Sequence, residues 1–229
     1  MLAQKLRLLK SLNIEVFLGI ELEFYSHLPK THFSYKNVVL KDEIGEGQIE
    51  AVFPHSNNIL ALLKQVINFR NNFKKEANFN AFFKSSLPPS AMQFNVSVLQ
   101  NGRSILNDNI LHFLLKQVEV NLQHFAPSLN CKKRLCNIKG IKVFRNSPYT
   151  ISVGYKENRT AMIRVRDGYF EHRLPSPKCK ILKSFDSILN AIILGVGSKT
   201  DYTVNILHSN CFEEEVISSF NLKLIKNYF

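Results

Sequence analysis

The sequence lacks most of the features that mark secreted, membrane-spanning or disulfide-bonded proteins. It has no run of eighteen apolar residues, as a transmembrane helix would require. The opening residues 1–12 contain no signal-peptide cleavage pattern. The four cysteines, Cys131, Cys136, Cys179 and Cys211, are never spaced as C-x-x-C, which favours free thiols in a reducing compartment. We therefore expect a soluble, cytoplasmic protein with no membrane partner.

Acidic residues are also scarce, since 18 Asp and Glu stand against 30 Lys and Arg, for a net charge of +12. Together with eighteen Phe and seven Tyr, this charge could serve a protein that binds nucleic acid through phosphate contacts and base stacking. The lysines are scattered rather than clustered, so nucleic-acid binding is the less favoured interpretation. The apolar content of 45% is enough for one sizeable core. We predict a single domain over residues 1–229, in which residues 1–13 form an N-terminal extension that could be a short amphipathic helix.

Two glutamates lie two positions apart in an otherwise apolar segment, G-I-E-L-E-F-Y at residues 19–25. In a strand, Glu21 and Glu23 would project from one face, roughly 7 Å apart, where a nearby cation would offset their repulsion. Alternate glutamates also occur on solvated strand faces, so both interpretations stay open for this pair alone. Glu43 and Glu50 flank a glycine-broken turn further along. A set of three or four glutamates without Cys or His suits Mg²⁺ or Mn²⁺ and disfavours zinc or copper.

Hydrophobic periodicity predicts an α+β fold in which a curved antiparallel sheet is flanked by helices. The expected strands are residues 14–25, 38–41, 48–53, 92–99, 149–155, 161–166 and 169–173. The expected helices are residues 59–77, 107–124 and 184–196, with one more in the tail near 208–220. The second of these helices illustrates the signal, because an Asn107 cap precedes Ile110, Leu111 and Leu114 on one face.

Several of these segments, taken in order, resemble the catalytic domain of the glutamine synthetase family. G-I-E-L-E-F-Y is similar to the first metal-binding strand of that family, and E-I-G-E-G-Q-I-E, residues 43–50, keeps its Gly-Gln-x-Glu signature. A-M-Q-F-N-V-S-V, residues 91–98, resembles the segment that reads Gly-Met-His-x-His-x-Ser in the family. Further similar segments are residues 126–135, 158–165 and 170–177. The resemblance covers nearly the whole chain and implies a glutamine synthetase catalytic-domain-like fold.

The resemblance also implies roles for individual residues. The ligands of one Mg²⁺ or Mn²⁺ ion would be Glu23, Glu43 and Glu50, and those of a second ion would be Glu21, Glu171 and Gln93. The arginines facing the phosphates of ATP and the transferred phosphoryl group would be Arg159, Arg164 and Arg173. Asn95 and Ser97 would lie at the nucleotide, and Arg134 would hold the substrate carboxylate. Phosphoryl transfer from ATP to a carboxylate gathers negative charge, which is why such a site needs cations and guanidinium groups.

The implied activity is an ATP-dependent ligase that joins a small carboxylic acid to an amine or ammonia, of the glutamate–ammonia type, through an acyl-phosphate. Several departures fall on the acid and ammonia side. Pro88 and Pro89 replace an Asn-Gly pair that contacts glutamate, and proline offers no N–H. The loop after Arg134 reads C-N-I-K-G-I-K and lacks the carboxylate that helps to deprotonate ammonium.

Other departures concern the second cation and the phosphates. Gln93 and Asn95 replace two histidines, and an uncharged amide oxygen should bind the second cation more weakly. Tyr169 replaces another phosphate-facing arginine. Only about eighteen residues precede Gly19, too few for the β-grasp domain that the family places there. We therefore also expect a homo-oligomer or a second subunit that supplies this domain. The alternative function is a degenerate homologue that binds Mg·ATP as a regulatory or vestigial module.

Overall fold

The computed structural model describes residues 1–82, 87–127, 148, 150–208, 218–219 and 221–225. Its helices are α1 (Leu2–Ser11), α2 (Ile59–Asn72), α3 (Asp108–Phe125) and α5 (Ile181–Gly197), with a 3₁₀ turn η1 (Lys30–Phe33). Its longer strands are β1 (Ile14–Tyr25), β2 (Val39–Asp42), β3 (Gln48–Ser56), β4 (Met92–Gln100), β6 (Thr150–Tyr155), β7 (Ala161–Arg166) and β8 (Tyr169–His172). Three two-residue strands complete the set, namely β5 (Arg103–Ser104), β9 (Ile206–Leu207) and β10 (Lys223–Leu224).

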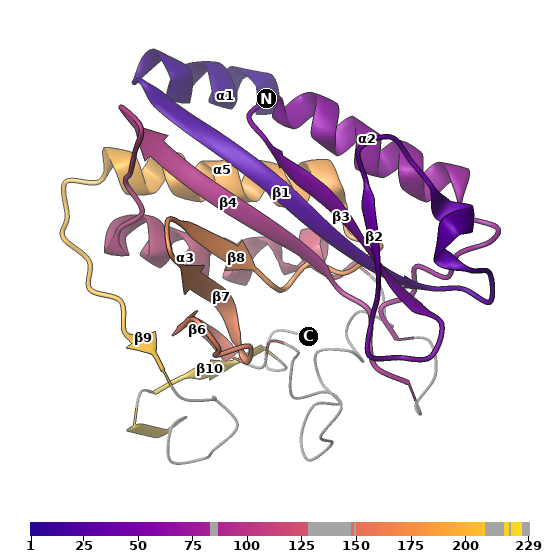
Figure 1. The fold of residues 1–229 in the computed structure, drawn as a ribbon. Helices are drawn as coiled ribbons and strands as arrows, with labels where there is room; N and C mark the ends of the chain where they lie inside the picture. Colours follow the sequence, from indigo (N-terminus) through magenta and orange to yellow (C-terminus); the bar gives the residue numbers. More distant parts are fainter. Residues whose placement is uncertain (83–86, 128–147, 149, 209–217, 220, 226–229) are drawn as a thin grey trace.

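The described strands form one ten-stranded sheet in the order β10-β6-β7-β8-β4-β1-β3-β2, with β5 added to β4 and β9 to β6 (Figure 1). This arrangement of an open curved sheet with helices confirms the predicted α+β fold. The prediction that the sheet is antiparallel is wrong for one region. Strand β6 pairs in parallel with both β7 and β9, so the sheet is mixed.

A buried asparagine holds the short connection between the parallel strands β6 and β7. Residues 156–160 lead the chain back from the end of β6 to the start of β7. Within this connection, Asn158 is 2% exposed, and its side-chain Nδ2 donates to the Leu207 carbonyl at 3.1 Å. Its Oδ1 accepts bonds from Thr160 N (3.1 Å) and Thr160 Oγ1 (2.7 Å). A Cβ atom on Gly154 would come within 2.9 Å of Asn158, so only glycine fits beside this connection.

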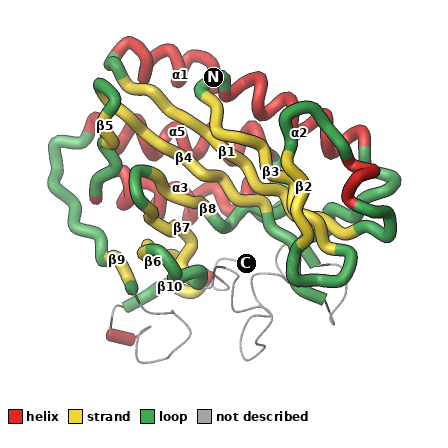
Figure 2. The backbone as a smooth tube through the Cα atoms, viewed as in Figure 1, coloured by secondary structure: helices red, strands yellow, loops and turns green. Residues whose placement is uncertain are grey.

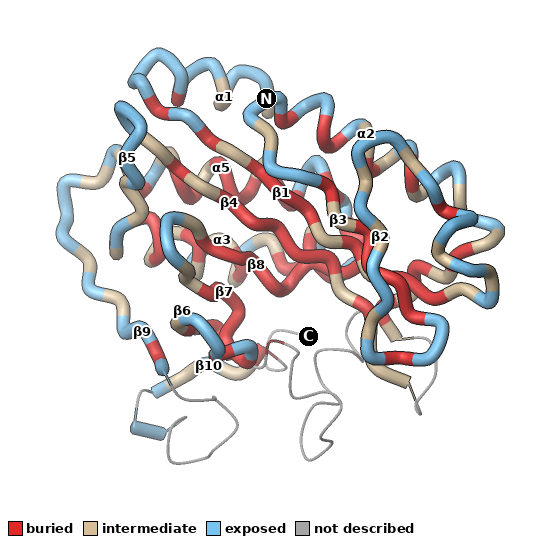
Figure 3. Tube along the Cα trace, in the orientation of Figure 1, coloured by how far each residue is buried: buried red, intermediate tan, exposed pale blue. Residues whose placement is uncertain are grey.

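All four described helices lie on one face of the sheet (Figures 1 and 2). Alternate residues of β1 explain this layering, because Leu18, Ile20, Leu22 and Phe24 are fully buried beneath the helices. Their removal from water is the main stabilising term of such a layer. Figure 3 shows the buried stretch running through the centres of the long strands. The intervening residues of β1, which include the two predicted glutamates, therefore project from the opposite face.

Helix boundaries differ from prediction mainly where the chain makes tertiary contacts. The helix predicted to reach residue 77 ends at Asn72, because Asn78 instead forms a β-bridge with Tyr25 at the end of β1. The N-terminal extension forms helix α1, which packs on α5 and carries an ion pair from Lys5 to Asp186 at 2.7 Å. The predicted tail helix lies almost entirely outside the described residues. Among the residues described, none of the helices is both long enough and apolar enough to span a bilayer.

Candidate functional site

A row of polar side chains crosses the sheet on the face opposite the helices. It spans strands β3, β1, β4, β8 and β7, where residues directly opposite in register project to the same side. The opposed pairs are Glu50–Glu23, Glu21–Gln93, Asn95–Glu171 and Glu171–Arg164. Segments far apart in the sequence thus bring the predicted carboxylates, amides and arginines onto one surface.

This row opens into a cavity of about 280 Å³ with walls of opposite charge. The acidic wall is formed by Glu21, Glu23, Glu43 and Glu50, and the basic wall by Arg159, Arg164, Arg166 and Arg173. Gln93 also lines the cavity. Every predicted cation ligand except Glu171 is therefore in the lining, and all three predicted phosphate-facing arginines are there too.

The remaining predicted residues lie around or beyond the cavity. Glu171 is 1% exposed and contacts two of the arginines from behind. Asn95 donates from Nδ2 to Glu21 Oε1 at 3.2 Å, and Ser97 lies two residues further along β4. Arg134 lies outside the described residues, so its predicted contact with the substrate carboxylate stays a prediction.

The four glutamates of the acidic wall carry more negative charge than the one nearby lysine, Lys41, can neutralise. Burial, followed by the nearby charges of Glu50 and Glu171, raises the pKa of Glu21 to about 7. Burial and the charge of Glu43 also raise the pKa of Glu50, although Lys41 Nζ lies 3.3 Å from its Oε1. Glu23 is oriented by the Ala91 N–H, which donates to its Oε2 at 2.7 Å. Crowded, partly buried carboxylates of this kind favour a bound cation.

Arginine side chains form the basic wall around a single carboxylate. Arg164 and Arg173 both pair with Glu171, and Arg173 Nη1 lies 2.5 Å from its Oε1. The same Nη1 also donates to Gln93 Oε1 at 3.3 Å, while Arg173 Nε donates to the Arg159 carbonyl at 3.2 Å. Arg173 is consequently anchored at three points and is only 6% exposed.

The two consecutive prolines form a rigid part of the cavity wall. The Tyr25 hydroxyl donates to the Pro88 carbonyl at 2.7 Å, and Gln48 Nε2 donates to the Pro89 carbonyl at 3.3 Å. Gln48 Oε1 in turn accepts from Gly45 N at 3.1 Å, where a Cβ atom would collide with the Tyr25 hydroxyl. The prolines offer the cavity no N–H donor, so a ligand meets a surface without the backbone donors of an Asn-Gly pair.

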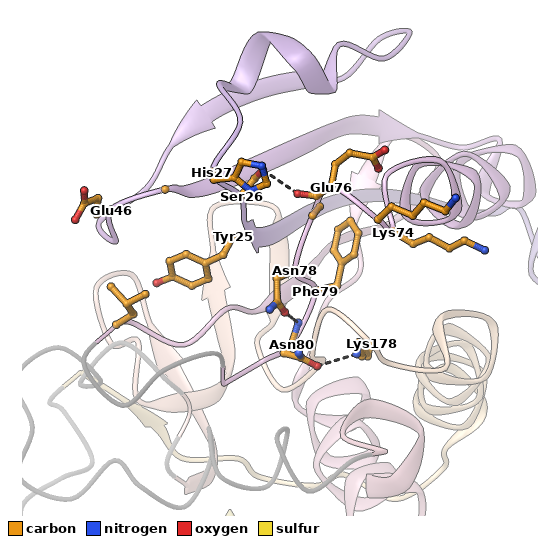
Figure 4. A pocket seen from close by; sticks show the side chains of 14 residues that line it. Tyr25, Ser26, His27, Glu46, Lys74, Glu76, Asn78, Phe79, Asn80 and Lys178 are labelled. Atoms are coloured by element: carbon orange, nitrogen blue, oxygen red, sulfur yellow. Dashed lines mark hydrogen bonds between the residues drawn. The ribbon is translucent and has the colours of Figure 1, made fainter.

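A second, larger cavity of about 1210 Å³ has Tyr25 in its lining (Figure 4). Its wall includes Ser26, whose hydroxyl donates to the Glu76 carbonyl, and Lys178, whose Nζ donates to Asn80 Oδ1 at 2.7 Å. None of the described residues in its lining is a predicted site residue. We therefore place the candidate site in the smaller cavity, which the predicted glutamates and arginines line.

The sequence-based prediction missed two charged residues of this cavity, although each lies two positions from a predicted site residue. Arg166 follows Arg164 by two positions in a predicted strand, so alternation along the strand places both side chains on the same face. Lys41 precedes Glu43 by two positions and lies opposite Glu50 in register. The alternation was visible in the sequence, but the strand pairing that brings Lys41 beside Glu50 was not.

The fit of a metal ion differs between the two predicted positions. Within the part of the chain that the structure describes, no three His, Cys, Asp or Glu side chains are already arranged to hold a metal ion. Glu23, Glu43 and Glu50 nevertheless line one cavity and present only oxygen donors, which fits Mg²⁺ or Mn²⁺. The second position fits poorly, because Gln93 and Glu171 are both bonded to Arg173.

No protein-family model matches the chain, and a comparison with curated proteins found no match. Solved structures do match in fold. The complex of GmaS with ADP has a TM-score of 0.78 and 18% identity, over 97% of this chain and 64% of that one. Plasmodium falciparum glutamine synthetase has a TM-score of 0.67 and 16% identity, over 87% and 55%. GmaS without ligand has a TM-score of 0.70 and 16% identity, over 97% and 62%.

These matches define the class of fold. The chain has the fold of the catalytic domain in glutamine synthetase-type structures, as the sequence resemblance implied. It spans between about half and two thirds of the length of the proteins it matches. At 16–18% identity the likeness concerns the fold alone, and activity must be argued from the cavity.

Proposed function

We propose that the protein is a glutamine synthetase-like, ATP-dependent carboxylate–amine ligase that acts through an acyl-phosphate. The observation that carries the proposal is a single cavity with four glutamates on one wall and four arginines on the other. A reaction that brings a polyphosphate to a carboxylate needs this opposition of cation-binding oxygens and guanidinium groups. The ADP named in the complex of the similar GmaS structure is consistent with a nucleotide.

The proposed reaction has two balanced steps. A carboxylate oxygen of the acid attacks the γ-phosphorus of ATP, so that an O–P bond forms while the bond to the β–γ bridging oxygen breaks and ADP leaves. A neutral amine or ammonia then attacks the acyl carbon, so that a C–N bond forms while the acyl C–O bond to phosphate breaks. The proton lost by the nitrogen is taken up by the leaving phosphate, which departs as hydrogen phosphate. The arginines stabilise charge on the transferred phosphoryl group in the first step.

The cavity residues divide between these tasks. Glu23, Glu43 and Glu50 would hold one divalent cation, which would offset phosphate charge and act as a Lewis acid. Arg159, Arg164 and Arg173 would face the phosphates, and Asn95 and Ser97 would lie toward the nucleotide. The Arg134 position would bind the acid. The prolines in the wall support an acid or amine site that differs from the one implied by the resemblance.

A second candidate is a degenerate homologue that binds Mg·ATP without ligase chemistry, as a regulatory or vestigial module. The pairing of Glu171 and Gln93 with Arg173 favours it, because two predicted cation ligands are engaged inside the protein. This candidate predicts nucleotide binding without ADP release under any combination of acid and amine.

Release of ADP from Mg·ATP distinguishes the two candidates. The purified protein is incubated with glutamate plus ammonium or hydroxylamine, and then with other acids and amines. The ligase predicts release that requires both substrates and that Glu23→Ala abolishes, with Glu15→Ala on the same strand as a matched control outside the cavity. Release that survives Glu23→Ala in a folded protein would make the assignment wrong.

A further inference from the structure

A groove of about 640 Å³ lies on the helical side of the sheet and shares no lining residue with the candidate cavity. Its volume is within the roughly 300–1,000 Å³ of typical small-molecule sites. Helix α1 contributes Ala3, Leu6, Arg7 and Lys10, which lie on one side of the helix because they are three or four residues apart. At about 1.5 Å of rise per residue, this stripe is about 10 Å long. The groove is therefore elongated along α1.

The end of the groove near the N-terminus of α1 is apolar. The first turn of α2 lies next to this end (Figure 1), and Leu60 of that turn lines the groove together with Leu6 and Val16. Leu60 is 45% exposed. Covering such a side chain with an apolar group removes hydrocarbon surface from water, which is favourable. This end of the groove therefore suits a hydrocarbon chain.

The opposite end of the groove is polar. Lys10 lies in the last turn of α1, and the Asn13 N–H donates to its carbonyl at 3.0 Å. Asn101 comes from the neighbouring strand, because Ile14 and Gln100 are opposite in register. Lys10, Asn13 and Asn101 all line the groove, so an ammonium group and two amide groups converge there. Such donors suit an anionic oxygen.

The charges in the groove favour a ligand with a single negative charge. Neither Arg7 nor Lys10 forms an ion pair with a described residue, and both side chains are exposed. Glu15 is the one carboxylate among the described lining residues. The formal charge of the lining is thus about +1, which one monoanion would neutralise.

We infer that this groove binds a medium-chain fatty acid, with its carboxylate at Lys10, Asn13 and Asn101 and its chain extending along α1 toward Leu60. The ligand would combine a charge-assisted hydrogen bond at one end with burial of apolar surface at the other. The site is separate from the candidate cavity, so the inference goes beyond the proposed function and does not rest on it.

Calorimetric titration of the full chain with octanoate tests the inference, and 1-octanol serves as an uncharged probe with the same chain. We expect one octanoate per chain and a Kd for octanol that is about threefold to tenfold higher. Lys10→Gln should raise the octanoate Kd by a similar factor and leave the octanol Kd unchanged, whereas Leu60→Ala should raise both. Lys64→Gln is the matched control, because Lys64 is exposed on α2 and lies outside the groove lining.

Equal octanoate affinity in the Lys10→Gln and Lys64→Gln variants would overturn the inference, as would binding of several octanoates per chain or of none. Sedimentation with phosphatidylserine vesicles covers a different occupant. Binding to the vesicles without binding to free octanoate would show that this surface meets a membrane instead. Circular dichroism checks the fold of each variant, which should be kept because the replaced side chains are exposed. None of these results depends on ATP turnover, so the proposed function is tested separately.

Discussion

At the scale of single residues, the arginines of the cavity differ in how they are engaged. Arg164 and Arg173 are held against Glu171 and are nearly buried. Arg159 and Arg166 form no ion pair with any described residue, although both line the cavity. Guanidinium groups without a carboxylate partner among the described residues are the best placed to bind an anionic ligand.

Replacement of Arg166 should therefore weaken nucleotide binding while leaving the fold intact. We expect Arg166→Met to raise the Kd for Mg·ATP by roughly tenfold to a hundredfold, as for loss of a hydrogen bond to a charged group. Isothermal titration calorimetry measures this change. The matched control is Arg103→Met, because Arg103 is exposed on β5 and lies outside the cavity lining. Equal affinity in the two variants would contradict a phosphate-facing role for Arg166.

His172 should make the stability of the protein sensitive to acid. It is 1% exposed, its ring stacks on Phe125 with centroids 4.7 Å apart, and its Nδ1 has no hydrogen-bond partner among the described residues. Burial lowers the pKa of His172 to about 3. Between that value and the ordinary histidine pKa, His172 is therefore protonated in the unfolded chain but neutral in the folded protein. Stability should then be unaffected above about pH 6.5 and fall by a few kcal/mol, in order of magnitude, as pH drops from about 6.5 to 3.

Urea unfolding at a series of pH values measures this effect. We expect His172→Leu to show a shallower decline of unfolding free energy with falling pH, since the titrating group is gone. His27→Leu is the control, because His27 is exposed and should keep the wild-type slope. Identical slopes in the His172→Leu variant and the wild type would show that this residue does not govern the acid response.

Single residues were predictable where the strand period alone places a side chain. Glu21 and Glu23 lie on one face because side chains alternate along a strand. The bond from Arg173 to Gln93 was not predictable, because those residues are 80 positions apart and meet only when β4 and β8 pair. Lys41 was missed as a partner of Glu50 for the same reason.

At the scale of elements, the connection between β6 and β7 depends on one buried side chain. Asn158 ties residues 156–160 to Leu207 on β9 and to Thr160 at the entrance to β7. Arg159 follows immediately and lines the cavity. The conformation of this short segment thus couples the parallel pairing of the sheet to the placement of a cavity arginine.

We expect Asn158→Ala to destabilise the protein by about 2–4 kcal/mol, because buried hydrogen-bonding groups of the backbone would lose their partner. Chemical unfolding measures the change in free energy. The control is Asn71→Ala, since Asn71 is exposed at the end of α2 and should change stability by less than about 0.5 kcal/mol. A destabilisation no larger than that of the control would mean that the connection is held by other contacts.

Most elements were predictable from periodicity, whereas the direction of the strands was not. The alternation of Leu18, Ile20 and Leu22 determines which face of β1 packs against helices. The same pattern is compatible with parallel or antiparallel neighbours, so the parallel pairing of β6 was missed. The end of α2 was also misplaced, because the β-bridge at Asn78 competes with helical continuation.

At the scale of the whole molecule, one sheet and one apolar cluster join the two ends of the chain. Buried residues from Leu9 to Ile225 belong to the same hydrophobic cluster. The charged cavity lies on the opposite side of that sheet from the helices, so the helical layer supports the strands without entering the site. This separation allows the cavity residues to diverge while the core keeps the fold.

The prediction of a single domain over residues 1–229 leads to a simple expectation for unfolding. Because one cluster spans the chain, the protein should unfold in one cooperative transition. Far-ultraviolet circular dichroism and tyrosine fluorescence, which is usable because the chain has no tryptophan, should give coincident curves. Two separate transitions, or curves that do not coincide, would show that the chain folds as more than one unit.

The sequence by itself determined the fold class, the order of the main strands and helices, and the carboxylates and arginines on which a phosphoryl-transfer site could be built. The elements follow from local periodicity, which acts over a few positions. The roles of the carboxylates and arginines are what the resemblance of ordered segments to the glutamine synthetase family implies. Tertiary structure alone decided the pairing of Arg173 with Glu171 and Gln93, the place of Lys41 and Arg166 in the cavity, and the parallel run of β6. Each of these depends on contacts between segments far apart in the chain, whose register no local pattern carries.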